Sequence, residues 1–84
     1  MSASETSLTS VLERFPDRKD TLKQLFREKR SFQTLCEDRR RCAEALKYWC
    51  RSDAEEAEER KNEYSELLLD LEIEIVQNIT EFNA

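Results

Sequence analysis

Residues 32–49, FQTLCEDRRRCAEALKYW, carry the repeat that decides the fold. Spacings of three and four residues place side chains on one face of an α-helix, as in the a and d positions of a coiled coil. Arg39 fills the one polar position of the series, and its apolar members are Phe32, Leu35, Cys42, Leu46 and Trp49. The stretch therefore predicts a first long amphipathic helix over residues 31–52.

A second long helix is predicted over residues 53–82. Ser52-Asp53-Ala54-Glu55 has the pattern of a capping box, in which a serine and a glutamate three residues later cap a first helical turn. Because the connection near residues 51–53 is short, the two helices are expected to be antiparallel neighbours in a coiled-coil-like hairpin. The face of the second helix that is expected to pack against the first, its seam, consists of Ala57, Lys61, Tyr64, Leu68, Leu71, Ile75, Asn78 and Phe82. Leu67, Val76 and Ile79 widen this face.

The residues before the hairpin predict one or two short helices over residues 6–30. One helix is expected over residues 6–14, and Pro16 suits the first turn of another that runs to about residue 29. Ser31 is a candidate N-cap for the first long helix, and residues 1–5 are expected to be disordered. The predicted fold class is all-α, with residues 1–84 in a single domain.

Composition supports a helical protein and argues against both a membrane protein and a secreted protein. The chain has no glycine, one proline, 39% charged and 38% hydrophobic residues, a mixture typical of long amphipathic helices. No apolar run approaches the roughly 18 residues of a membrane span, and the N-terminus lacks the pattern of a signal peptide. An odd number of cysteines is a poor disulfide framework. We therefore expect a cytoplasmic protein with reduced thiols.

Basic residues dominate the first part of the chain and acidic residues the second. Residues 13–51 contain twelve Lys or Arg and seven Asp or Glu, whereas residues 52–84 contain two Lys or Arg and eleven Asp or Glu. The net charge of the whole chain is −5. Opposite charges favour pairing of the two arms across their seam. The run Arg39-Arg40-Arg41 could instead contact nucleic acid, but an acidic helix beside it would repel phosphates. Nucleic acid is therefore the less favoured partner.

The sequence lacks the residue types on which most catalytic and metal sites depend. There is no histidine to act as a base or ligand and no glycine to form a phosphate-binding loop. Cys36, Cys42 and Cys50 form no CxxC pair, and a structural zinc ion needs four ligands. We predict that the protein is not an enzyme and binds no metal or cofactor. Whether any of the three thiols is redox-active stays open.

A two-helix seam leaves apolar surface without a cover, which predicts a protein–protein interaction. The N-terminal helices can cover part of it, and self-association as a dimer or four-helix arrangement can cover the rest. The alternative is an adaptor or regulator that docks on a larger cytoplasmic complex through the basic face of residues 39–51. The predicted partner-interface residues are Arg40, Arg41, Tyr48, Leu67, Leu68, Leu71, Ile75 and Ile79.

Residues 15–79 resemble the YdcH-like family of small bacterial helical-hairpin proteins. The resemblance rests on Phe15-Pro16 at a helix start and on the spacing from there to Ser31-Phe32-Gln33-Thr34-Leu35. The arginine run, Trp49 and the residues before Phe15 depart from the family pattern. The resemblance implies a helical hairpin, and the family has no established activity and no catalytic residues to transfer. The other matching positions are Leu22, Leu25, Leu46, Arg60, Lys61, Leu67, Leu68 and Leu71.

Overall fold

A computed structural model of the chain describes residues 3–82, with side chains from residue 6 onward. Within that range every element of regular secondary structure is a helix, and none is a strand, which confirms the all-α prediction. Residues 3–5 belong to the first helix and residues 1–2 lie outside the described range, so the disorder of residues 1–5 stays a prediction. The elements are α1 (Ala3–Arg14), the 3₁₀ turn η1 (Pro16–Arg18), α2 (Lys19–Glu28), α3 (Arg30–Arg51) and α4 (Ala57–Phe82).

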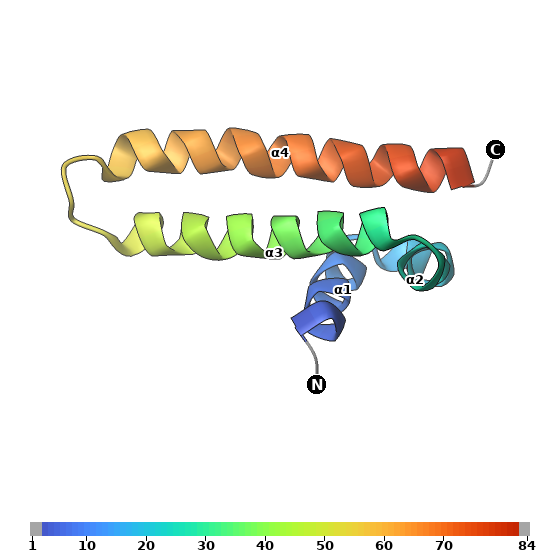
Figure 1. Cartoon of the computed structure of the whole chain (residues 1–84). Helices are drawn as coiled ribbons and strands as arrows, with labels where there is room; N and C mark the ends of the chain where they lie inside the picture. Colours follow the sequence, from blue (N-terminus) through green and yellow to red (C-terminus); the bar gives the residue numbers. More distant parts are fainter. Residues whose placement is uncertain (1–2, 83–84) are drawn as a thin grey trace.

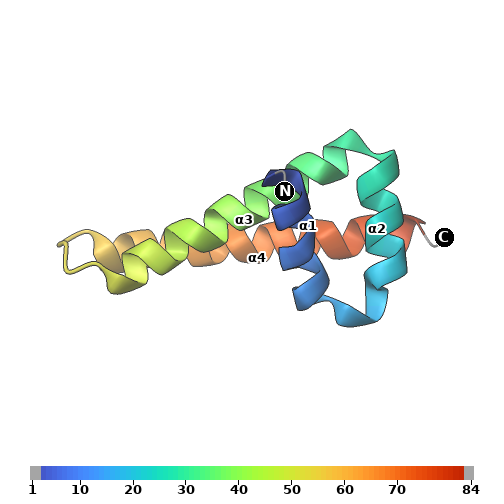
Figure 2. The ribbon, with the colours of Figure 1, turned by 90° about the horizontal axis from the view of Figure 1, so that it is seen from below.

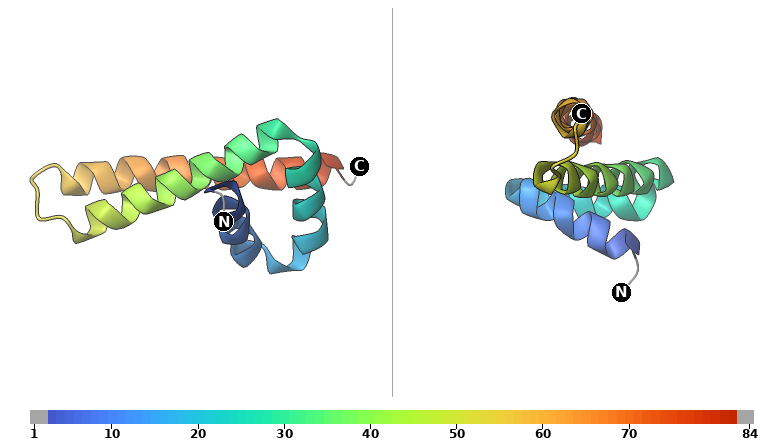
Figure 3. Two further views of the ribbon diagram at one scale, coloured as in Figure 1. Left: turned by 60° about the horizontal axis from the view of Figure 1, so that its bottom comes forward. Right: turned by 90° about the vertical axis from the view of Figure 1, so that its left-hand side faces the viewer.

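The two long helices, α3 and α4, lie side by side and run in opposite directions (Figure 1). The two short helices lie across α3 on the side away from α4, close to the end remote from the connection (Figures 1 and 2). Figure 3 shows successive layers along the hairpin, formed by α4, α3 and the short helices. Helix α2 also contacts α4, near its C-terminal end. The half of the hairpin next to the connection is therefore not covered by α1 or α2.

The hydrophobic core lies where the short helices meet the hairpin. Val11 of α1 and Leu22 and Leu25 of α2 are fully buried beside Phe32 of α3 and Ile75 of α4. The short helices thus bury part of the apolar surface that the hairpin alone would leave exposed. The remaining buried members of the cluster are Leu35, Cys36, Cys42, Leu71 and Ile79.

The connection between the long helices is longer than the capping box predicted. Helix α3 ends at Arg51, and Ser52 is extended, with φ −83° and ψ 141°. The Ser52 hydroxyl accepts a hydrogen bond from the Ala54 amide at 3.1 Å, two residues on, and α4 begins only at Ala57. The predicted start at residue 53 is wrong, because residues 52–56 are needed to cross the gap between antiparallel helices.

The break between α2 and α3 falls at Lys29, before the serine that was the candidate cap. Lys29 is extended, with φ −123° and ψ 114°, and α3 begins at Arg30. Ser31 lies inside the first turn, so its predicted N-cap role is wrong. The Gln33 side-chain amide donates to the Phe26 carbonyl at 2.7 Å and satisfies one acceptor at the end of α2.

The last turns of α3 are less buried than their heptad positions predicted. Leu46 and Trp49 are half-buried and lie outside the core cluster. Tyr48 is exposed and meets the Trp49 ring edge-to-face, with 5.0 Å between ring centroids. The reason is the length of the covering elements: α1 and α2 end before this part of the hairpin (Figure 2).

Candidate protein-interaction surface

The arginine run at residues 39–41 holds α1 on the hairpin. Arg39 donates to the Ser10 hydroxyl at 3.0 Å, and Arg40 donates to the Ser7 hydroxyl at 3.1 Å. Arg39 is buried and Arg40 is half-buried, whereas Arg41 is exposed. The interface role of Arg40 stays a prediction: its guanidinium group is half-buried and bonded to Ser7, and Arg41 alone of the three is exposed.

The attraction predicted between the basic and acidic arms is concentrated on one carboxylate. Glu72 of α4 pairs with Arg39 of α3 at 2.9 Å and with Arg14 of α1 at 3.2 Å. Other ion pairs lie within a single helix: Arg40–Glu44, Arg60–Glu63 and Lys61–Glu58. The charge contrast therefore fastens three helices at one place.

Three of the predicted interface residues on α4 belong to the core. Leu71, Ile75 and Ile79 are buried against the other helices, and Leu68 is partly buried against them. A side chain that is buried inside the molecule cannot at the same time contact a partner. The prediction is wrong for Ile75 and Ile79, whereas Leu71 still lines a hollow between α3 and α4 and Leu67 is exposed as a partner contact requires.

The exposed apolar surface of α4 lies on a different row of residues. Leu69, Ile73 and Val76 are 59%, 49% and 46% exposed. Their spacing of i, i+4 and i+7 places them on one face of the helix, and we call these three residues the outer stripe. Sequence reasoning missed Leu69 and Ile73, and it wrongly placed Val76 on the inward-facing side of the helix. The available signal was that seven of residues 67–76 are Leu, Ile or Val, more than one face of a helix needs.

A shallow groove of about 300 Å³ runs between the outer stripe and the end of α1. Phe15, half-buried, forms its apolar wall on the α1 side, and the Arg14–Glu72 ion pair lies at its edge. Such a groove offers apolar contacts and no reactive group. We call it the outer groove; it is lined by Arg14, Phe15, Leu69, Glu72, Ile73, Val76 and Gln77.

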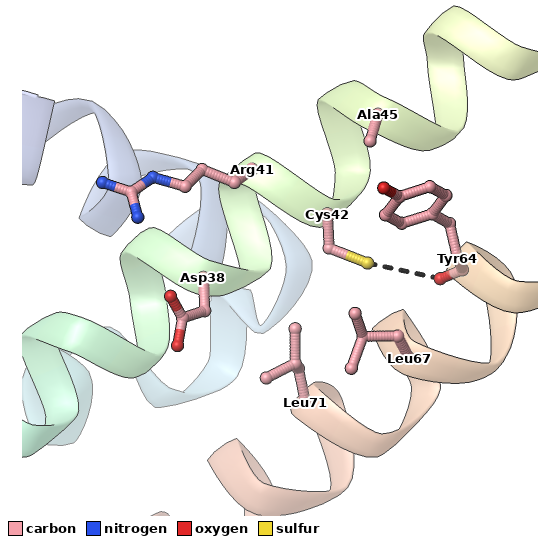
Figure 4. A pocket seen from close by; sticks show the side chains of 7 residues that line it. All are labelled: Asp38, Arg41, Cys42, Ala45, Tyr64, Leu67 and Leu71. Carbon is pink, nitrogen blue, oxygen red and sulfur yellow. Dashed lines mark hydrogen bonds between the residues drawn. The ribbon is translucent and has the colours of Figure 1, made fainter.

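A second hollow, the hairpin cleft, lies between α3 and α4 (Figure 4) and has a volume of about 310 Å³. Figure 4 shows Leu67 and Leu71 pointing towards Cys42, while the guanidinium group of Arg41 points away from them. The Cys42 thiol donates to the Tyr64 carbonyl at 3.2 Å. The cleft is lined by Asp38, Arg41, Cys42, Ala45, Tyr64, Leu67 and Leu71.

The two buried thiols are chemically protected, and the third is exposed. Burial raises the pKa of Cys36 from 9.0 to about 12, although the positive charge of Arg39 acts in the opposite direction. Burial also raises the pKa of Cys42. A raised pKa lowers the fraction of reactive thiolate at neutral pH. Cys50 is free and exposed near the connection. Residues 3–82 contain no group of three or more metal-ligating side chains placed to hold a metal ion.

Comparison with protein-family models, with curated proteins and with solved structures finds no match to this chain. The resemblance to the YdcH-like family therefore stays a prediction. Among the described residues, no helix has both the length and the apolar character needed to cross a membrane.

Proposed function

We propose that this protein acts without catalysis, by binding another protein in the outer groove of α4. The observation that carries the proposal is the outer stripe, three large aliphatic side chains that are about half exposed on one face of a helix. A helix that is recognised through its apolar face presents anchors at spacings such as i, i+4 and i+7. Leu69, Ile73 and Val76 give α4 an apolar face of this kind for a partner to contact.

The position of the outer stripe supports this choice over the hairpin cleft. The opposite face of α4 is fixed in the core by Leu71, Ile75 and Ile79, so the stripe sits on a helix that cannot easily rotate. Completing the burial of three half-exposed aliphatic side chains contributes on the order of 1 kcal/mol each. The cleft offers a single exposed aliphatic residue, Leu67.

In this arrangement the coiled-coil-like hairpin of α3 and α4 supports the outer stripe, and Arg14 and Phe15 at the end of α1 form the other wall of the groove. The adaptor alternative, which uses the basic face of residues 39–51, has less support because Arg39 and Arg40 are bonded to Ser10 and Ser7. Self-association as a dimer or four-helix arrangement stays a prediction. Sedimentation equilibrium at tens of micromolar would measure it directly.

Site-specific photo-crosslinking tests the proposal. A benzophenone amino acid replaces Gln77, which lines the outer groove, and in a matched control replaces Asn62, which is exposed near the other end of α4. In source cells we expect a discrete adduct from position 77 that disappears when Ile73→Asp is added. Mass spectrometry identifies the adduct and distinguishes another protein from a second copy of the chain.

Two results would contradict the proposal. One is labelling from position 77 that does not exceed labelling from position 62. The other is an adduct that persists with Ile73→Asp, since a partner seated on the stripe must lose contact when a carboxylate enters it.

A further inference from the structure

The outer groove lies in an acidic part of the molecule. Residues 62–82 contain six Asp or Glu and no Lys or Arg. Glu66, Asp70 and Glu74 are exposed and follow one another at spacings of four residues, so they form a row along α4 that we call the acidic ridge. Glu66 precedes Leu69 by three residues and Asp70 precedes Ile73 by three, which makes the acidic ridge the direct neighbour of the outer stripe.

The other edge of the groove carries no comparable excess of charge. Arg14 is the basic residue that lines it, and its guanidinium group is paired with Glu72 at 3.2 Å. Glu72 is paired in turn with Arg39. A ligand seated on the stripe would therefore have uncompensated carboxylates along one flank and a neutralised cluster along the other.

We infer that the occupant of the outer groove is a cationic amphipathic helix of another protein. Its apolar side chains cover Leu69, Ile73 and Val76, and Lys or Arg on one flank faces the acidic ridge. This inference rests on the proposed function and names the class of partner. Complementary charge of this kind sets orientation, association rate and choice of partner more than raw affinity.

A second copy of the chain fits the groove less well. In α2 and in the first turns of α3, which are rich in Lys and Arg, the apolar faces turn into the core: Leu22 and Leu25 of α2 and Phe32 and Leu35 of α3 are buried. A second copy would therefore bring another α4 and its carboxylates. Like charges at such a contact oppose association, and the same repulsion disfavours nucleic acid and anionic membranes.

Two matched synthetic peptides of about 18 residues, or five helical turns, test the inference against the full chain. Both carry Leu at i, i+4 and i+7 positions; one has Lys and the other Glu at every flanking position. Fluorescence anisotropy of labelled peptide measures the dissociation constants at about 0.05 M and about 0.5 M NaCl, where screening of exposed charges differs strongly. The protein variants are Ile73→Ser and the triple change Glu66→Gln, Asp70→Asn and Glu74→Gln.

We expect the Lys peptide to bind about tenfold or more tightly than the Glu peptide, since several exposed charge pairs change sign between them. The ratio should shrink at high salt and in the triple variant, and Ile73→Ser should weaken both peptides. Circular dichroism must show unchanged helicity in each variant. Trp49 fluorescence provides a second check on folding, because Trp49 is not among the residues that line the groove.

Other results separate the inference from the proposed function. Equal binding of both peptides, lost in Ile73→Ser, overturns the cationic partner while leaving the outer groove as the docking surface. If Ile73→Ser leaves the dissociation constant of the Lys peptide unchanged, the inference is overturned, because attraction between charges alone would then explain the binding. Absence of binding by either peptide also overturns it, and crosslinking from position 77 then decides the proposed function independently.

Discussion

Arg39 of α3 and Glu72 of α4 form an ion pair of 2.9 Å in which the two side chains are only 9% and 16% exposed. Arg39 also donates to Ser10 of α1, and Glu72 also accepts from Arg14 of α1. Three helices therefore meet at one pair of opposite charges. In such a place, removing one charge is costly because it leaves the other without its partner and out of water.

Glu72→Ala should lower the free energy of unfolding by about 3 kcal/mol, because Arg39 then stays buried without a carboxylate. The double change Arg39→Met with Glu72→Leu should cost less than Glu72→Ala alone, since an apolar pair of similar volume needs no desolvation of charge. Urea denaturation followed by circular dichroism measures both.

Glu44→Ala provides the matched control for the buried pair. Glu44 is exposed and pairs with Arg40 one helical turn away at 3.0 Å, and such a pair contributes about 0.3–0.5 kcal/mol. If Glu72→Ala were no more destabilising than Glu44→Ala, the pair between α3 and α4 would not be fastening the helices as the geometry indicates.

Ile75 and Val76 are neighbours in sequence that point to opposite environments. Ile75 is fully buried and Val76 belongs to the outer stripe. Ile75→Ala should cost about 2–5 kcal/mol through lost burial and a residual cavity, whereas Val76→Ala should change the free energy of unfolding by less than about 0.5 kcal/mol. Thermal and urea unfolding of both variants check this. Equal losses would show that α4 is rotated relative to the described structure.

The same residues show how far the sequence could predict the fold. Spacings of three and four correctly predicted two long helices and the burial of Phe32, Leu35 and Cys42. The same spacing overestimated the burial of Leu46 and Trp49, which are only half-buried. Periodicity specifies which face of a helix is apolar, but how much of that face is covered depends on the length and placement of α1 and α2.

The candidate surface was harder to predict because α4 is apolar on more than one face. Ile73 and Ile75 are two residues apart and chemically alike, yet Ile75 is buried and Ile73 is half exposed. The rotation of α4 decides between them, and Glu72 faces Arg39 and Arg14 in the rotation observed. A contact between residues 33 positions apart is not visible in local spacing, so the sequence assigned Leu71, Ile75 and Ile79 to the partner interface.

Alkaline pH should destabilise the fold through Cys36. Because burial raises the pKa of the Cys36 thiol from 9.0 to about 12, the folded state retains a proton that the unfolded state releases. The protonated Cys36 thiol therefore makes its full contribution to the free energy of unfolding below pH 9. This contribution is lost as the pH rises towards 12, and the free energy of unfolding falls by up to about 1.4 kcal/mol per pH unit for one proton.

Urea unfolding at a series of pH values measures this slope, and Cys36→Ala provides the comparison. The variant is expected to be less stable at every pH, because it loses core volume, but its stability should fall less steeply above pH 9. The remaining slope belongs to other groups, including Cys42, whose pKa burial also raises. Parallel slopes in the two proteins would rule out Cys36 as the titrating group.

Thiol labelling should distinguish Cys50 from the other two cysteines. Cys50 is exposed, whereas Cys36 and Cys42 are buried and react as thiolates only after the surrounding structure opens. Ellman's reagent at neutral pH should therefore modify one thiol per chain rapidly and two slowly, and Cys50→Ala should remove the rapid phase alone. Rapid reaction of all three would show an open core.

A rapid phase that slows as protein concentration rises would instead indicate that a second copy covers the connection end of the hairpin, because dilution dissociates such a contact.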